Sequence, residues 1–160
     1  MSILERLFNR KKRRTQSDDV NGFLIEMYDR ICRKSQDGDQ LNCLTGPEQV
    51  FLVTQQVETE VNNGGFSQYF CNSSGNLANR MVDAFTEIGA EKTAEICKRA
   101  LEVFGGTVPA NRRERIERLD DEAADEIFEA CDEAFYRYEE DLNALNFDYI
   151  MKHKMDFPVE

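Results

Sequence analysis

A regular apolar stripe runs through the most acidic part of the chain and restricts what this sequence can fold into. Between residues 121 and 142, apolar side chains recur every three or four positions, at Ala124, Ile127, Phe128, Cys131, Phe135, Tyr138 and Leu142. This period places them on one face of an α-helix, whereas a half-buried strand would need alternation with a period of two. We therefore predict one long helix from Asp121 to Leu142 with a buried apolar face.

The same helical spacing recurs along the rest of the chain. Apolar residues follow it over residues 19–35, 46–61, 77–88, 91–104 and 111–119. Thr45 and Glu48 fit a capping box at the start of the second of these segments. Sustained alternation with a period of two is found nowhere, and 160 residues, 41% of them hydrophobic, suffice for one core. We predict an all-α fold, a compact multi-helix single domain.

Charge divides the chain into a short basic arm, residues 1–17, and an acidic domain, residues 18–160. The net charge is −11, but residues 1–14 carry +5, so the other 146 residues carry −16. Such a domain repels phosphate, and we expect it to bind a cationic partner and no DNA directly. The arm contains a basic run at Arg10, Lys11, Lys12, Arg13 and Arg14.

This arm leaves an alternative function open. Ile3, Leu4, Leu7 and Phe8 precede the basic run at helical spacing, which suits weak contact with an anionic membrane. The protein would then be a membrane-surface adaptor anchored by the arm. The simpler interpretation is a frayed terminal helix with a solubilising tail.

The acidic charge is densest between residues 120 and 141, which contain eleven carboxylates and one base. Seven of these carboxylates form two adjacent rows on the predicted helix, at Asp121, Glu122, Asp125, Glu126, Glu129, Asp132 and Glu133. Such rows advance about 6 Å per four residues, comparable with one phosphate per ~3.4 Å along each DNA strand. We take these seven as candidate partner-binding residues that present charge as DNA does. The alternative is a solvated acidic surface.

Signatures of the common enzyme classes are missing from the sequence. His153 is the only histidine, the five cysteines form no C-x-x-C pair, and no glycine-rich phosphate loop or G-x-S-x-G motif occurs. We predict a protein that is not an enzyme and has no catalytic residues, metal or cofactor. Carboxylate pairs such as Asp83 and Glu87 leave a carboxylate-metal hydrolase as a less favoured alternative. Without a long apolar run or a signal-peptide pattern, we expect a cytoplasmic protein.

A dense run of small, polar and aromatic residues follows the second predicted helix. Its members are Asn62, Asn63, Gly64, Gly65, Phe66, Gln68, Tyr69, Phe70, Asn72, Ser73, Ser74 and Gly75. The run resembles the fingerprint of the bacterial DNA-mimic protein family, acidic helical proteins known for dimers whose surface charge imitates duplex DNA. The resemblance implies a homodimer that binds the basic DNA-binding surface of a regulator or nucleoid protein and competes with DNA.

We expect this motif to be structural, with glycines for a turn, aromatic residues for the core and polar groups for helix ends. A second interpretation assigns it a ligand-binding role. In that case its polar side chains would form a pocket for a polar ligand, lined by Asn62, Asn63, Gln68, Asn72 and Ser74.

Overall fold

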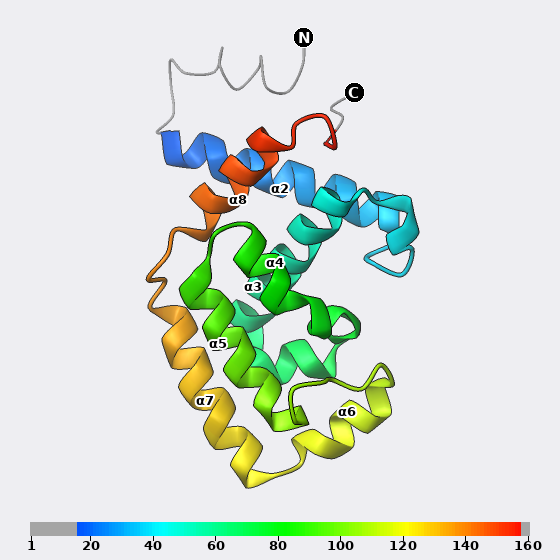
Figure 1. Cartoon of the computed structure of the whole chain (residues 1–160), viewed down its shortest axis with the longest axis vertical. Helices are drawn as coiled ribbons and strands as arrows, with labels where there is room; N and C mark the ends of the chain where they lie inside the picture. Colours follow the sequence, from blue (N-terminus) through cyan, green and yellow to red (C-terminus); the bar gives the residue numbers. More distant parts are fainter. Residues whose placement is uncertain (1–15, 158–160) are drawn as a thin grey trace. The chain divides into compact units, whose positions relative to one another are not determined.

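The computed structural model describes the backbone of residues 16–157 and the side chains of residues 19–157 (Figure 1). This part of the chain contains seven α-helices and three short 3₁₀ helices, with no strand among its elements. The predicted all-α class is therefore confirmed. The basic run from Arg10 to Arg14 lies outside the described residues, so the predicted arm stays a prediction. Within the described range, no helix is both long enough and apolar enough to span a bilayer.

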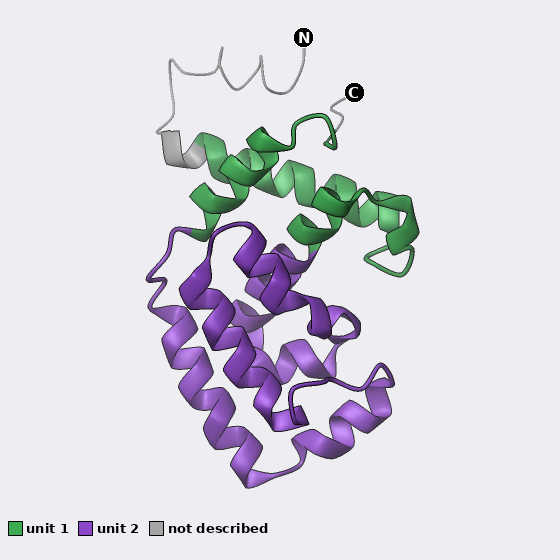
Figure 2. Cartoon of the chain, in the orientation of Figure 1, with its two compact units in different colours: residues 1–52, 142–160 green, residues 53–141 purple. Residues whose placement is uncertain are grey.

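The chain divides into two compact units (Figure 2). Unit 1 comprises residues 1–52 and 142–160, and unit 2 comprises residues 53–141. The helices of unit 1 are α2 (Gln16–Ser35), a 3₁₀ helix (Leu41–Cys43), the first part of α3 (Gly46–Cys71) and α8 (Leu142–Lys152).

The core of unit 1 joins its N-terminal and C-terminal segments. The ring of Phe23 in α2 meets that of Phe147 in α8 edge-on, with centroids 5.5 Å apart. Phe51 in α3 meets Phe157 in the same way, at 6.1 Å. The C-terminal segment is therefore packed against α2 and α3 within unit 1.

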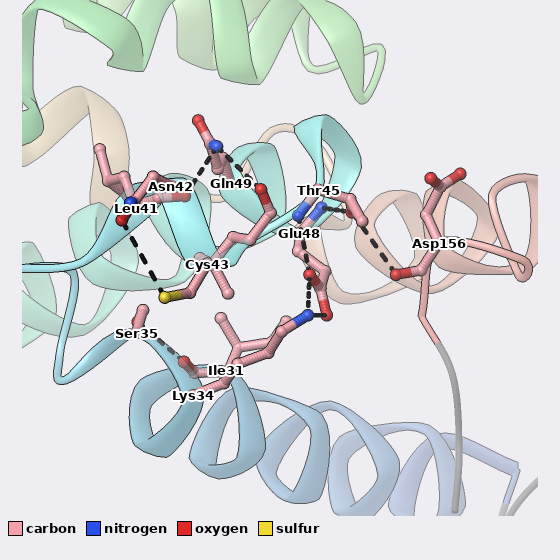
Figure 3. Close-up of polar contacts among 11 residues, drawn as sticks. Ile31, Lys34, Ser35, Leu41, Asn42, Cys43, Thr45, Glu48, Gln49 and Asp156 are labelled. Carbon is pink, nitrogen blue, oxygen red and sulfur yellow. Dashed lines mark hydrogen bonds and ion pairs between the residues drawn. The ribbon is translucent and has the colours of Figure 1, made fainter.

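The predicted capping box at the start of α3 is confirmed (Figure 3). The Glu48 N–H donates to Thr45 Oγ1 at 3.3 Å, and the Thr45 N–H donates to Glu48 Oε2 at 2.9 Å. Lys34 Nζ lies 2.6 Å from the same carboxylate, whose side chain is only 4% exposed. The cap thus also links α3 to α2 within unit 1.

Unit 2 contains the second part of α3 and all elements up to residue 141. They are a 3₁₀ helix (Ser73–Arg80), α4 (Met81–Glu87), α5 (Glu91–Leu101), a 3₁₀ helix (Glu102–Phe104), α6 (Arg112–Leu119) and α7 (Glu122–Tyr136). α5 packs against both α4 and α7 (Figure 1). Aromatic contacts fill the core: the Phe70 ring lies 5.5 Å from that of Phe128 and 4.8 Å from that of Phe104, and Phe66 lies 5.9 Å from Phe135.

The predicted single helix from Asp121 to Leu142 is wrong at its C-terminal end. α7 ends at Tyr136, Tyr138 has a positive φ of 44°, and α8 begins at Leu142. The carboxylate of Glu140 accepts hydrogen bonds from the N–H groups of Lys92 and Thr93, at 3.0 and 2.9 Å. A carboxylate is favourable at a helix N-terminus such as that of α5, and this interaction would be lost if α7 continued.

Candidate functional site

α3 is kinked where the motif places two adjacent glycines. Gly65 has φ 75° and ψ −178°, a conformation that is essentially restricted to glycine. The helix resumes at Phe66, whose N–H donates to Asp132 Oδ1 in α7 at 2.8 Å. Asp132 therefore caps the second part of α3, which is the buried aromatic segment of the motif.

This contact separates Asp132 from the other candidate partner-binding residues. Its side chain is half-buried, and burial raises the pKa of its carboxyl, with the Phe66 N–H offsetting only part of the effect. One carboxylate oxygen is already used inside the fold. We therefore treat Asp132 as a positioning residue for α3 and leave it out of the exposed surface described below.

The remaining acidic residues of α7 lie on the surface. Asp121 caps α7, because its Oδ1 accepts from the Ala123 N–H at 3.1 Å. The other five are exposed, and we call them the acidic face: Glu122, Asp125, Glu126, Glu129 and Glu133. At 100° per residue they fall within a sector of about 100°, roughly opposite the buried stripe on the helix. No ion pair in the described part of the chain involves any of the five.

The polar side chains of the motif converge on one carboxylate, that of Glu60. Gln68 Nε2 and Asn72 Nδ2 donate to Glu60 Oε2 at 2.6 and 2.9 Å, and Ser74 Oγ donates to Oε1 at 2.9 Å. These three groups belong to the five that the pocket interpretation assigned to a ligand. Because they bind a side chain of this chain, the contacts support the structural interpretation of the motif.

The aromatic and small residues of the motif are equally internal. Phe66, Tyr69 and Phe70 are 0% exposed. A Cβ added at Gly75 would lie 2.8 Å from the carbonyl oxygen of Tyr69, so only glycine fits there. The motif thus builds the bend and the core on which α7 lies.

Sequence reasoning missed Arg115, which is 0% exposed. Its guanidinium donates to five acceptors, all neutral: the carbonyl oxygens of Phe70 (2.8 Å), Asn72 (3.1 Å), Pro109 (3.1 Å) and Ala110 (3.0 Å), and the side chain of Asn76 (2.9 Å). Burial lowers the pKa of this guanidinium. In the sequence it looks like its exposed neighbours in α6, and nothing in the local pattern marks it as buried.

The pKa of Asp132 leads to a prediction about pH. The pKa of this carboxyl is higher in the native state than in the unfolded chain, so the native state binds the proton more tightly. The contribution of Asp132 to the free energy of unfolding therefore falls as pH rises from the unfolded-state pKa through the native-state pKa. Asparagine keeps an acceptor for the Phe66 N–H without the charge. We expect the melting temperature of D132N relative to wild type to increase from pH 4 to pH 7. D125N, on the exposed side of α7, is the control, and an equal increase in both variants would contradict the assignment.

Within the described residues, no group of three or more His, Cys, Asp or Glu side chains is placed so that it could hold a metal ion. Asp83 and Glu87, the pair noted in the sequence, lie on the exposed side of α4.

Comparison with known proteins identifies a family for most of the chain. A family model described as DMP19-like protein matches residues 42–153, which is 112 of the 160 residues. No curated protein and no solved structure gives a significant match. The matched range includes the whole motif, the buried Arg115 and the acidic face of α7. The chain belongs to the DMP19-like protein family.

Proposed function

We propose that this protein is a DNA mimic that binds the basic DNA-binding surface of a regulator or nucleoid protein and competes there with DNA. The observation that carries the proposal is the acidic face, five exposed carboxylates on one side of a single helix, none of which pairs with a cation among the described residues. Membership of the DMP19-like family and the resemblance of the motif to the DNA-mimic fingerprint support it. The resemblance also supports a homodimer, which would present the face twice.

The energetics of α7 agree with such a role. Like charges four residues apart each destabilise a helix by about 0.2–0.5 kcal/mol, as between Glu122 and Glu126 or Asp125 and Glu129. The buried stripe, with Phe128 and Phe135 both 3% exposed, holds the helix in place against this repulsion. A cationic partner relieves the repulsion and releases counterions, so its affinity falls as salt is added.

The test is affinity capture from the source cell's lysate, with elution by a salt step and competition by duplex DNA. We expect a DNA-binding protein to be captured, released by moderate salt and displaced by duplex. A protein that is retained in the presence of excess duplex, or a capture that contains no DNA-binding protein, would overturn the proposal.

A charge-reversal variant assigns the binding surface. We expect E122K/D125K/E129K to abolish capture of that partner and to retain the helical circular-dichroism spectrum, because these side chains are exposed and form no hydrogen bond or ion pair within the described part of the chain. The matched control is D83K/E91K/E114K, which changes the net charge equally at exposed positions of α4, α5 and α6. Equal loss of capture in both variants would mean that total charge, and not the acidic face, determines binding.

A further inference from the structure

Two exposed tyrosines lie at the C-terminal end of the acidic face. Tyr136 is 49% exposed and Tyr138 is 42% exposed, although both are large and mainly apolar. Tyr136 is the last residue of α7, and in helical projection it lies about 20° from both Asp125 and Glu129. The row of carboxylates therefore ends in an aromatic ring on the same side of the helix.

Both tyrosines are held in position by the same turn of α3. The hydroxyl of Tyr136 donates to the carbonyl oxygen of Val61 at 2.7 Å. The hydroxyl of Tyr138 donates to Glu58 Oε1 at 2.9 Å and accepts from Asn62 Nδ2 at 2.6 Å. The rings are thus oriented before any partner arrives, which reduces the entropy that binding would otherwise cost. Their hydroxyls are used internally, so a partner meets mainly ring surface.

Carboxylates lie near both rings. Asp132 lies one turn before Tyr136 on α7, and Glu58 receives the hydroxyl of Tyr138 and interacts with Asp141. Burial, together with the nearby charge of Glu58, raises the pKa of Tyr138 to about 12, so its hydroxyl stays protonated and remains a donor at neutral pH. An aromatic face beside carboxylates attracts a cation by its quadrupole and by charge at once.

The two basic side chains differ at such a surface. A guanidinium is planar and weakly hydrated, so it stacks on a ring while its N–H groups bind a carboxylate. The lysine ammonium is a strongly hydrated point charge and gains less from the ring. Tyrosine is also among the residues that most often dominate binding energy at protein interfaces.

We propose that Tyr136 and Tyr138 form an arginine-binding end of the acidic face and make this protein select partners whose basic surface is rich in arginine over lysine. The proposal rests on the proposed function, since it names the chemistry of the partner that the acidic face binds. It adds a residue-level source of selectivity that charge alone does not supply.

The test compares octa-arginine and octa-lysine peptides, equal in length and charge, binding to the full chain. We expect wild type to bind octa-arginine about two- to fivefold more tightly, since a cation–π contact at an exposed ring contributes about that much. Y136L/Y138L removes the rings and should bring the two affinities together. Y136F/Y138F keeps the rings, loses the hydroxyl contacts to α3, and should keep the preference.

Each outcome bears on the proposal. Loss of the preference for octa-arginine in both the leucine and the phenylalanine variants would assign the tyrosines a structural role. A preference that persists in Y136L/Y138L would mean that other residues cause it. Either result overturns this proposal and leaves the proposed function standing. Failure of wild type to bind both peptides would overturn both. Thermal unfolding shows whether each variant is folded. If Y136L/Y138L does not fold, Y136L alone, which removes one hydroxyl contact, gives the decisive comparison.

Discussion

Replacement of Arg115 by methionine is expected to lower the free energy of unfolding by about 3–5 kcal/mol, because it removes the donor of five hydrogen bonds in one step. The guanidinium is 0% exposed and donates five hydrogen bonds. Methionine fills a similar volume but donates none of these five hydrogen bonds, so each acceptor loses its contact with residue 115. Two of them, the carbonyls of Phe70 and Asn72, close the end of the aromatic segment of α3, so we expect α3 and α6 to loosen together. Urea unfolding followed by circular dichroism measures the loss.

The control lies two residues away in the same helix. Arg113 has an 87% exposed side chain and pairs with Glu117 on the surface at 3.0 Å, so R113M should change stability by no more than about 0.5 kcal/mol. R115K keeps the charge but offers three donors on a compact group, and we expect a loss between those of R113M and R115M. If R115M and R113M unfold at the same urea concentration, the network around Arg115 does not stabilise the fold as we describe.

The contrast between these arginines shows where sequence reasoning succeeds and where it stops. Helix positions follow from local periodicity, which is why the class, the capping box at Thr45 and the helix from Arg112 to Leu119 were predictable. The role of Arg115 depends on carbonyls up to 45 residues away, and no local pattern encodes that distance. The early end of α7 has the same cause, since Glu140 binds Lys92 and Thr93, 48 and 47 residues earlier.

The candidate site also combines features that the sequence predicts with features that depend on distant contacts. Exposure of the five acidic-face residues follows from their spacing relative to the buried stripe and was predictable. Asp132 has the same spacing, but its contact with the Phe66 N–H crosses 66 residues. Tyr138 was placed on the buried stripe because the helix was extended too far. A break in α7 after Tyr136 moves the Tyr138 ring to the surface, and the arginine-selectivity hypothesis arises only from the structure.

The kink in α3 gives the second large effect: G65A is expected to lower the free energy of unfolding by about 2–5 kcal/mol. Gly65 has φ 75° with ψ −178°, where any Cβ is strained. A Cβ at this position would also lie 2.2 Å from Asp132 Oδ2, so the carboxylate that caps Phe66 must move. Backbone strain and loss of the cap therefore act together, and thermal and urea unfolding measure the sum.

Two further variants separate these contributions. Gly105 also has a positive φ, 70°, but nothing lies within 4 Å of an added Cβ, so G105A should cost only about 1–2 kcal/mol of left-handed strain. In a D132A background the collision is absent, and G65A should then cost about 1–3 kcal/mol less than in wild type. An identical cost of G65A in both backgrounds would show that Asp132 does not limit this position. A smaller cost in the D132A background would show that the kink at Gly65 and the Asp132 cap of Phe66 depend on each other.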